Sequence, residues 1–193
     1  MSIKTIYGIV ASILAVICFI PYIRDMLRKT TQPHIYTWLI WTILQVTGVI
    51  AMYKNRAGIG ALALAIGALF CGFICVLSLK YGTKNITPFD TFCLIGALAA
   101  TGTYAFLHRP LLSVILVSVI DFTGFLPTLR KAYSEPHSET LSMYTLFVIS
   151  GIFSVMALST YSLITTFYPL TLIIINILGT AMIWWRRKTF YNG

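Results

Sequence analysis

Charged side chains are scarce in this 193-residue chain. Asp, Glu, Lys and Arg together make up 10% of it, whereas hydrophobic residues make up 58%. A typical water-soluble domain carries about 25% charged residues, so this composition excludes a water-exposed surface and, with it, a soluble enzyme domain. Acids are the rarest, with 5 Asp and Glu against 14 Lys and Arg. We therefore predict an integral membrane protein whose solvent is the lipid bilayer.

Several classes of functional site are missing as well. The sequence contains no hydrolytic triad, zinc-binding pattern or phosphate-binding loop, so we expect no enzyme activity, no metal and no cofactor. The 4 cysteines lie inside apolar runs, where a thiol usually behaves as a small hydrophobic group. The basic residues lie near the ends of the apolar runs, where they set membrane topology. We therefore expect no nucleic-acid partner.

Apolar runs occupy most of the chain and are separated by short polar turns. A membrane-spanning helix needs about 20 apolar residues, and seven runs approach or exceed this length. The predicted spans are residues 6–27, 35–53, 57–79, 88–107, 111–133, 141–161 and 169–185. The predicted fold class is therefore an all-α integral membrane protein with seven transmembrane helices.

The distribution of basic residues predicts the orientation of the spans. With seven spans, most of the bases fall on the side of the C-terminus. They are Arg24, Arg28, Lys29, Lys80, Lys84, Arg130, Lys131, Arg186, Arg187 and Lys188, against Lys4, Lys54, Arg56 and Arg109 on the other side. Cytoplasmic loops carry the excess of Lys and Arg, so we expect a cytoplasmic C-terminus and an external N-terminus. The short basic termini favour a prokaryotic plasma membrane, and an endomembrane location is left open.

The two halves of the chain share residues at a constant offset, which indicates an internal repeat. An ungapped offset of 106 residues pairs Phe19 with Phe125, Pro21 with Pro127, Arg24 with Arg130 and Ala51 with Ala157. The simplest interpretation is a three-helix repeat in residues 1–84, a linker helix in 85–108 and a second three-helix repeat in 109–193. Because the linker is a single helix, the two repeats would have the same orientation in the membrane.

Each predicted repeat has a proline late in its first helix, then a basic residue, a polar turn and Ser or Thr at the start of the next helix. The proline segments are residues 19–24 and 125–130. This layout resembles the PQ-loop family of membrane proteins, which includes the SWEET and SemiSWEET sugar transporters and cystinosin. Tyr22 and Thr128 stand where that family has glutamine. The resemblance implies transport of a small polar solute, sugar-like or amino-acid-like.

Asp121 lies well inside the fifth apolar run. A carboxylate at the centre of a bilayer costs at least about 2.5 to 3.5 kcal/mol unless it is protonated, hydrated or paired, and no Lys or Arg lies deep within a predicted span. Residues 121–124 also resemble the acid-bearing segment of cystinosin, whose Asp is implicated in proton coupling. Asp121 is thus a candidate proton-coupling residue, or else a permanently protonated residue that bonds a neighbouring helix.

Three further residues are candidate solute ligands. Asn176 resembles the pocket asparagine of SWEET proteins, but its ungapped counterpart is Phe70, so the symmetric pair of amides is missing and a sugar is disfavoured. Gln45 is a second amide, although hydrogen bonding between helices is its more common role. Trp41 is the third candidate; together with Trp38 it opens the second span, where tryptophans usually form an interfacial belt.

Pro21 and Pro127 are candidate hinges, because a proline inside a helix removes a backbone hydrogen bond and bends it. Rocking of one repeat against the other would expose a midplane site to each side in turn. The predicted function is alternating-access transport of a small polar solute, with proton coupling through Asp121. The alternative is a non-transporting receptor or adaptor on the same scaffold, as in the fold-related KDEL receptor. Both halves are present in one chain, so a monomer suffices, and a homo-oligomer is left open.

Overall fold

The computed structural model describes residues 2–33, 35–82, 87–106, 109–134 and 136–191. Throughout these ranges the regular secondary structure is helical, and no strand occurs in them. Four helical segments are long and apolar enough to cross a membrane: Ile3–Leu27, Ile35–Lys54, Gly58–Tyr81 and Leu163–Thr189. Pro110–Phe125 and Leu141–Met156 are shorter apolar helices. This all-helical, apolar architecture is that of an integral membrane protein.

The described helices follow the predicted order closely. They are α1 (Ile3–Ile17), α2 (Phe19–Leu27), α3 (Ile35–Lys54), η1 (Gly58–Ala61), α4 (Leu62–Tyr81), α5 (Pro88–Phe106), α6 (Pro110–Ser134), η2 (Pro136–Ser138), α7 (Leu141–Met156) and α8 (Leu163–Tyr191). The first predicted span corresponds to α1 with α2, and the third to the short η1 with α4. Seven helical rods result in the part of the chain that the structure describes.

The first rod is interrupted at Cys18, between α1 and α2. Pro21 explains the position of this break, because its ring clashes with the carbonyl four residues earlier, that of Ile17, and it has no N–H to donate there. The Cys18 thiol donates to the Ala15 carbonyl at 3.3 Å. In the second half, α6 continues without interruption past residue 127; the side chain of Pro127 lies outside the described residues.

The last two helices correct predicted boundaries. The sixth span was expected to end at residue 161, but α7 ends at Met156. The seventh span was expected to begin at Pro169, but α8 begins at Leu163 and Pro169 lies inside it. The reason is a reciprocal cap: the Ser162 N–H donates to Thr165 Oγ1 at 2.9 Å, and the Thr165 N–H donates to Ser162 Oγ at 3.3 Å. These bonds satisfy backbone groups at the helix start, so the helix does not need the proline as its first residue.

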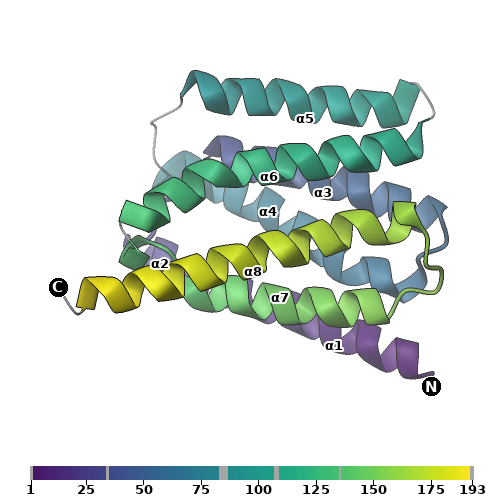
Figure 1. The fold of residues 1–193 in the computed structure, drawn as a ribbon, viewed down its shortest axis with the longest axis horizontal. Coiled ribbons are helices and arrows are strands. Elements are labelled where there is room, and N and C mark those ends of the chain that lie inside the picture. The colour runs from purple at the N-terminus through teal and green to yellow at the C-terminus, as the bar shows by residue number, and fades with distance from the viewer. Residues whose placement is uncertain (1, 34, 83–86, 107–108, 135, 192–193) are drawn as a thin grey trace.

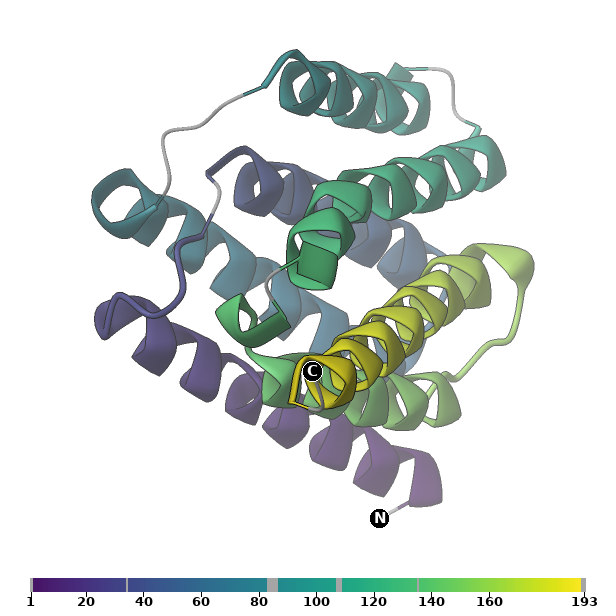
Figure 2. The ribbon, with the colours of Figure 1, turned by 60° about the vertical axis from the view of Figure 1, so that its left-hand side comes forward.

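The helices of each half share one packing order. In the first half α4 contacts both α1 and α3, and in the second half α8 contacts both α6 and α7. Across the halves α1 packs on α7 and α3 packs on α6, while α5 lies on the outside against α6 and α3 (Figure 2). Figure 1 shows α1 and α6 running in the same direction, and the two chain ends lie at opposite ends of the bundle.

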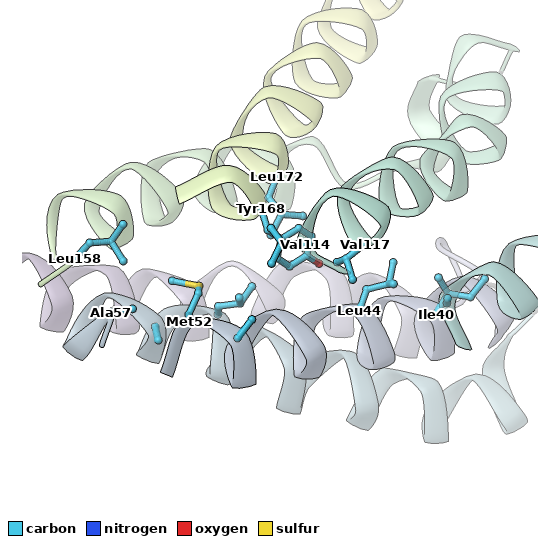
Figure 3. Packing of buried hydrophobic residues seen from close by; sticks show 13 residues of the cluster. Ile40, Leu44, Met52, Ala57, Val114, Val117, Leu158, Tyr168 and Leu172 are labelled. Carbon is cyan, nitrogen blue, oxygen red and sulfur yellow. The ribbon is translucent and has the colours of Figure 1, made fainter. Parts of the chain in front are cut away.

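The interior contains two large apolar clusters. In the first, which joins α3, α4, α6 and α8, the Tyr168 ring lies beside Val114 and Val117 of α6 (Figure 3). This ring packs directly on the backbone of α3, since a β-carbon built on Gly48 would lie 2.6 Å from it. The second cluster is rich in aromatic residues and surrounds the cavity described next.

Candidate functional site

A cavity of about 40 Å³ lies between the two halves of the bundle. Its lining comes from α2, α3 and α4 of the first half and from α6, α7 and α8 of the second. The polar lining residues are Gln45, Cys71, Asp121 and Asn176. The candidate residues Trp41, Gln45, Asp121 and Asn176, which lie far apart in the sequence, are therefore brought to one cavity. Pro21 is half-buried and does not line it.

The Asp121 carboxyl is buried in this cavity and has no partner among the described residues. Its side chain is 4% exposed, and the described residues give it neither a hydrogen bond nor an ion pair. The titratable groups that interact with it electrostatically are the Cys71 thiol of α4 and the Tyr168 hydroxyl of α8. A buried carboxyl with no neighbouring cation is costly when ionised, so it is suited to bind a proton or a cation.

Gln45 contributes to both helix packing and the cavity. Its Nε2 donates to the Cys71 sulfur at 3.2 Å, which ties α3 to α4. Its Oε1 is buried and has no hydrogen-bond partner in the described structure. A buried acceptor without a partner costs about 1 to 3 kcal/mol, and a ligand that donates a hydrogen bond would relieve that cost. The hydrogen bonding between helices that the sequence predicts therefore accounts for Gln45 Nε2 but not for Oε1.

Asn176 is partly exposed on α8, and its Nδ2 donates to the Leu172 carbonyl at 2.8 Å. One N–H of this amide is thus used within its own helix. At the corresponding place in the first half, the ring of Phe70 stacks on Phe19, with the centroids 4.8 Å apart and the planes 8° apart. The cavity is therefore asymmetric, with the Asn176 amide on one side and Phe19, which is stacked on Phe70, on the other.

Aromatic rings form most of the cavity wall. The lining rings are Phe19, Trp38, Trp41, Phe125, Tyr144 and Phe147. They make a continuous series across the halves, with centroid distances of 5.1 Å from Trp38 to Trp41, 6.2 Å from Trp41 to Phe125 and 5.8 Å from Phe125 to Tyr144. Trp38 is 2% exposed, so it belongs to this wall rather than to the interfacial belt expected for it.

The sequence analysis did not identify Tyr144, Phe147 or Cys71 as cavity residues. Each lies in a run of apolar residues, where side chains that face a cavity and side chains that face the core look alike. For Phe19 and Phe125 a signal was present, because these residues are paired by the internal offset. The offset did not show that both rings point at the same space, since that depends on how the halves pack.

Hydrogen bonds join the halves at the end of the bundle nearer the C-terminus. Asp25 of α2 accepts a hydrogen bond from Thr140, just before α7, at 2.9 Å, and its other carboxylate oxygen pairs with Arg24 at 2.9 Å. Within the second half, Arg187 donates to the carbonyls of Pro136 and Glu139 at 3.0 and 2.7 Å. Among the described residues, the Asp25–Thr140 bond is thus a polar link between the halves at this end.

A second set of bonds joins the halves at the end nearer the N-terminus. The Ser159 N–H donates to the Ala57 carbonyl at 2.9 Å, and Ser154 Oγ donates to the Gly60 carbonyl at 2.6 Å. Lys4 Nζ donates to the carbonyl of Leu158 at 2.7 Å. The cavity residues therefore lie between two groups of contacts, one at each end of the bundle.

Comparison of the chain with protein-family models, with characterised proteins and with solved structures gives no match. We therefore infer the function from the cavity itself.

Proposed function

We propose that this protein is a membrane transporter or facilitator of a small polar solute, and that the cavity between its halves is the solute site. The observation that carries the proposal is the unpaired, 4% exposed carboxyl of Asp121 on the wall of that cavity. Ionisable residues inside membrane helices usually mark pathways for solutes, ions or protons. Solute sites of secondary transporters commonly lie at the interface between repeats.

The proposed architecture is two parallel three-helix repeats, in residues 1–84 and 109–193, joined by a linker helix in 85–108. Its support is the packing order, because the third helix lies between the other two in each half, and the first helix of each half contacts the second helix of the other. The common direction of α1 and α6 (Figure 1) agrees with repeats of the same orientation. The cytoplasmic C-terminus and prokaryotic plasma membrane are proposed from the basic residues alone.

The proposed mechanism is alternating access. Opening of the Asp25–Thr140 end would connect the cavity with one side, and opening of the Ser154–Gly60 end would connect it with the other. The helix break at Cys18 supports a hinge role for Pro21, since Phe19 of the cavity wall follows the break directly. Pro127 is proposed as the second hinge from its place in the sequence.

The role proposed for Asp121 is proton coupling. Its carboxyl carries a proton when the cavity holds no solute, because no cation compensates an ionised form there, and it releases that proton when the solute provides compensation. Gln45, Asn176 and Trp41 would then bind the solute through hydrogen bonds and ring contact.

The test is solute uptake into proteoliposomes that contain a trapped pH indicator, with a panel of sugars, amino acids and amines. We expect uptake of at least one solute, at least a tenfold loss of that uptake in Asn176→Ala, and uptake insensitive to a pH gradient in Asp121→Asn. Thr171→Val is the matched control on α8, because the Thr171 hydroxyl bonds only the Phe167 carbonyl of its own helix among the described groups. If no solute in the panel moves, transport is wrong, and a receptor or adaptor that binds a partner without flux is the better account.

A further inference from the structure

The charge in the cavity has one sign. Among the described residues, its polar lining has a single acid, Asp121, and no Lys, Arg or His. A solute with its own carboxylate would bring a second negative charge into a site of low dielectric constant with no base to compensate it, which is strongly unfavourable. A ligand with a single positive charge would neutralise the Asp121 carboxylate.

The hydrogen-bonding groups of the cavity have the same bias. One N–H of each amide is engaged, Gln45 Nε2 by the Cys71 sulfur and Asn176 Nδ2 by the Leu172 carbonyl, and the Tyr144 hydroxyl donates to Glu139 at 2.9 Å. The Asp121 carboxyl, by contrast, accepts no hydrogen bond from the described residues, and Gln45 Oε1, which is buried against Gly67, also has no partner among them. A ligand that fits these groups donates hydrogen bonds, as an ammonium group does.

The aromatic wall favours the same chemistry. The faces of Trp, Tyr and Phe rings attract a cation within about 6 Å of the ring centre, and the attraction grows when the site excludes water. Trp38 and Trp41 pack edge to face at 5.1 Å, and Trp41 lies 6.2 Å from Phe125 across the halves. Several rings therefore surround the place where the charge of Asp121 is uncompensated.

From these three observations we infer that the solute is a small organic monocation, an amine or quaternary ammonium compound without a carboxylate, and that it exchanges with a proton on Asp121. Transport of this cation depends on the proposed function, whereas binding of the cation with release of the proton does not. The volume of about 40 Å³ suits a compact headgroup, since one water needs about 10 to 15 Å³ measured in this way. Ethanolamine is a suitable probe of this size.

The exchange conserves charge. The empty site holds Asp121 as a neutral acid, and binding of one monocation requires the carboxylate, so one proton leaves as one positive charge enters. The other titratable groups that interact with Asp121 are the Cys71 thiol and the Tyr168 hydroxyl. Two further helices, α3 and α5, pack on α6. From α3, Trp41 and Gln45 line the cavity, and neither has a titratable group. The described α5 residues in the first apolar cluster are Leu94 and Ala97, which are not titratable either. Asp121 is therefore the group that loses the proton.

The test compares four ligands of similar size that differ in charge: ethanolamine, ethylene glycol, glycine and glycolate. Binding to the purified full-length chain is measured by titration calorimetry in two buffers with different ionisation enthalpies, which also counts the protons released. We expect ethanolamine to bind at least tenfold more tightly than each of the other three, with release of about one proton per cation in the pH range where the empty site is protonated. Equal binding of glycine or ethylene glycol, or cation binding without proton release, would overturn the inference.

Variants assign the effect to the carboxyl. Asp121→Asn should weaken ethanolamine binding at least tenfold and abolish proton release, whereas Asp121→Glu, which keeps the charge, should retain both. Phe122→Leu, at an adjacent residue that is 42% exposed, is the control for an unspecific change in α6. Unchanged ethanolamine binding in Asp121→Asn would contradict the inference. If Asp121→Glu and Asp121→Asn are both folded and both lose ethanolamine binding and proton release, the charge is not the cause.

The same ligands separate this inference from the proposed transport. Ethanolamine binding with proton release, but without uptake into proteoliposomes, would refute transport and leave the cation site standing. Uptake of a sugar or an amino acid that is lost in Asn176→Ala, without ethanolamine binding, would refute the cation and leave transport standing.

Discussion

The side-chain oxygen of Gln45 lies in the space that a β-carbon at residue 67 would need, since a β-carbon built on Gly67 falls 2.5 Å from Gln45 Oε1. The glycine on α4 therefore permits the position of the amide on α3. In that position the amide also bonds Cys71, and Gln45 lines the cavity. One residue without a side chain thus shapes the polar part of the candidate site.

Gly67→Ala should displace the Gln45 amide and break its bond to Cys71. We expect at least a tenfold loss of solute binding, together with a decrease of about 1 to 3 kcal/mol in the free energy of unfolding, as is typical of overpacking. Gly72→Ala on the same helix is the control, because its nearest new contact is Thr42 Cγ2 at an ordinary 3.6 Å. Titration calorimetry and thermal unfolding in detergent measure the two effects, and equal behaviour of the two variants would contradict this role for Gly67.

The contact between α3 and α8 gives a prediction about stability. Gly48→Ala would place a methyl group 2.6 Å from the Tyr168 ring, so we expect a loss of about 1 to 3 kcal/mol of unfolding free energy. Gly124→Ala should be neutral or stabilising by up to about 1 kcal/mol, since no atom lies within 4 Å of its new β-carbon and alanine favours helix. Thermal unfolding of both variants in the same detergent measures their stability. If Gly124→Ala is less stable than Gly48→Ala, the packing described for these two glycines is contradicted.

The sequence predicted the helices and the polar residues of the cavity but not its aromatic wall. Hydrophobic runs predict where helices lie, so the order of the rods and most of their ends agree with the sequence. The start of α8 was missed, because a proline at residue 169 is a more visible start signal than the Ser162–Thr165 cap. Gln45, Asp121 and Asn176 could be identified because polar residues are conspicuous in apolar runs. The aromatic wall could not, because neither hydropathy nor spacing tells which rings face a cavity.

Thr140→Val removes the hydrogen bond to Asp25 that joins the halves near the C-terminus. Hydrogen bonds to charged groups contribute about 1.5 to 3 kcal/mol, so the bundle should shift toward a state open at this end. The measurement is pulsed electron paramagnetic resonance between spin labels at the exposed residues 28 and 142, and we expect a longer mean distance.

The matched control for Thr140 is Thr145→Val, because the exposed Thr145 hydroxyl donates to the Leu141 carbonyl of its own helix at 3.1 Å. It should leave the distance between the labels unchanged. An unchanged distance in Thr140→Val would mean that the Asp25–Thr140 bond does not hold this end closed.

At the opposite end, Ser154→Ala removes a buried bond of 2.6 Å to the Gly60 carbonyl. The loss should be about 1 to 3 kcal/mol of unfolding free energy, because the carbonyl is left buried without that partner. Ser12→Ala is the control, as Ser12 bonds the Gly8 carbonyl of its own helix at 2.7 Å, and it should cost less. Thermal unfolding in detergent checks the order, and a larger loss in Ser12→Ala would contradict a link between the halves at Ser154.

Alternating access to the cavity is tested most directly at Cys71, a 1% exposed residue of the cavity wall. The protein, with its other three cysteines changed to alanine, is placed in proteoliposomes with one orientation and treated with a membrane-impermeant thiol reagent from one side or the other. We expect Cys71 to be modified from both sides, and a bound solute to slow both reactions at least tenfold. Modification from one side only, or none before unfolding, would contradict alternating access.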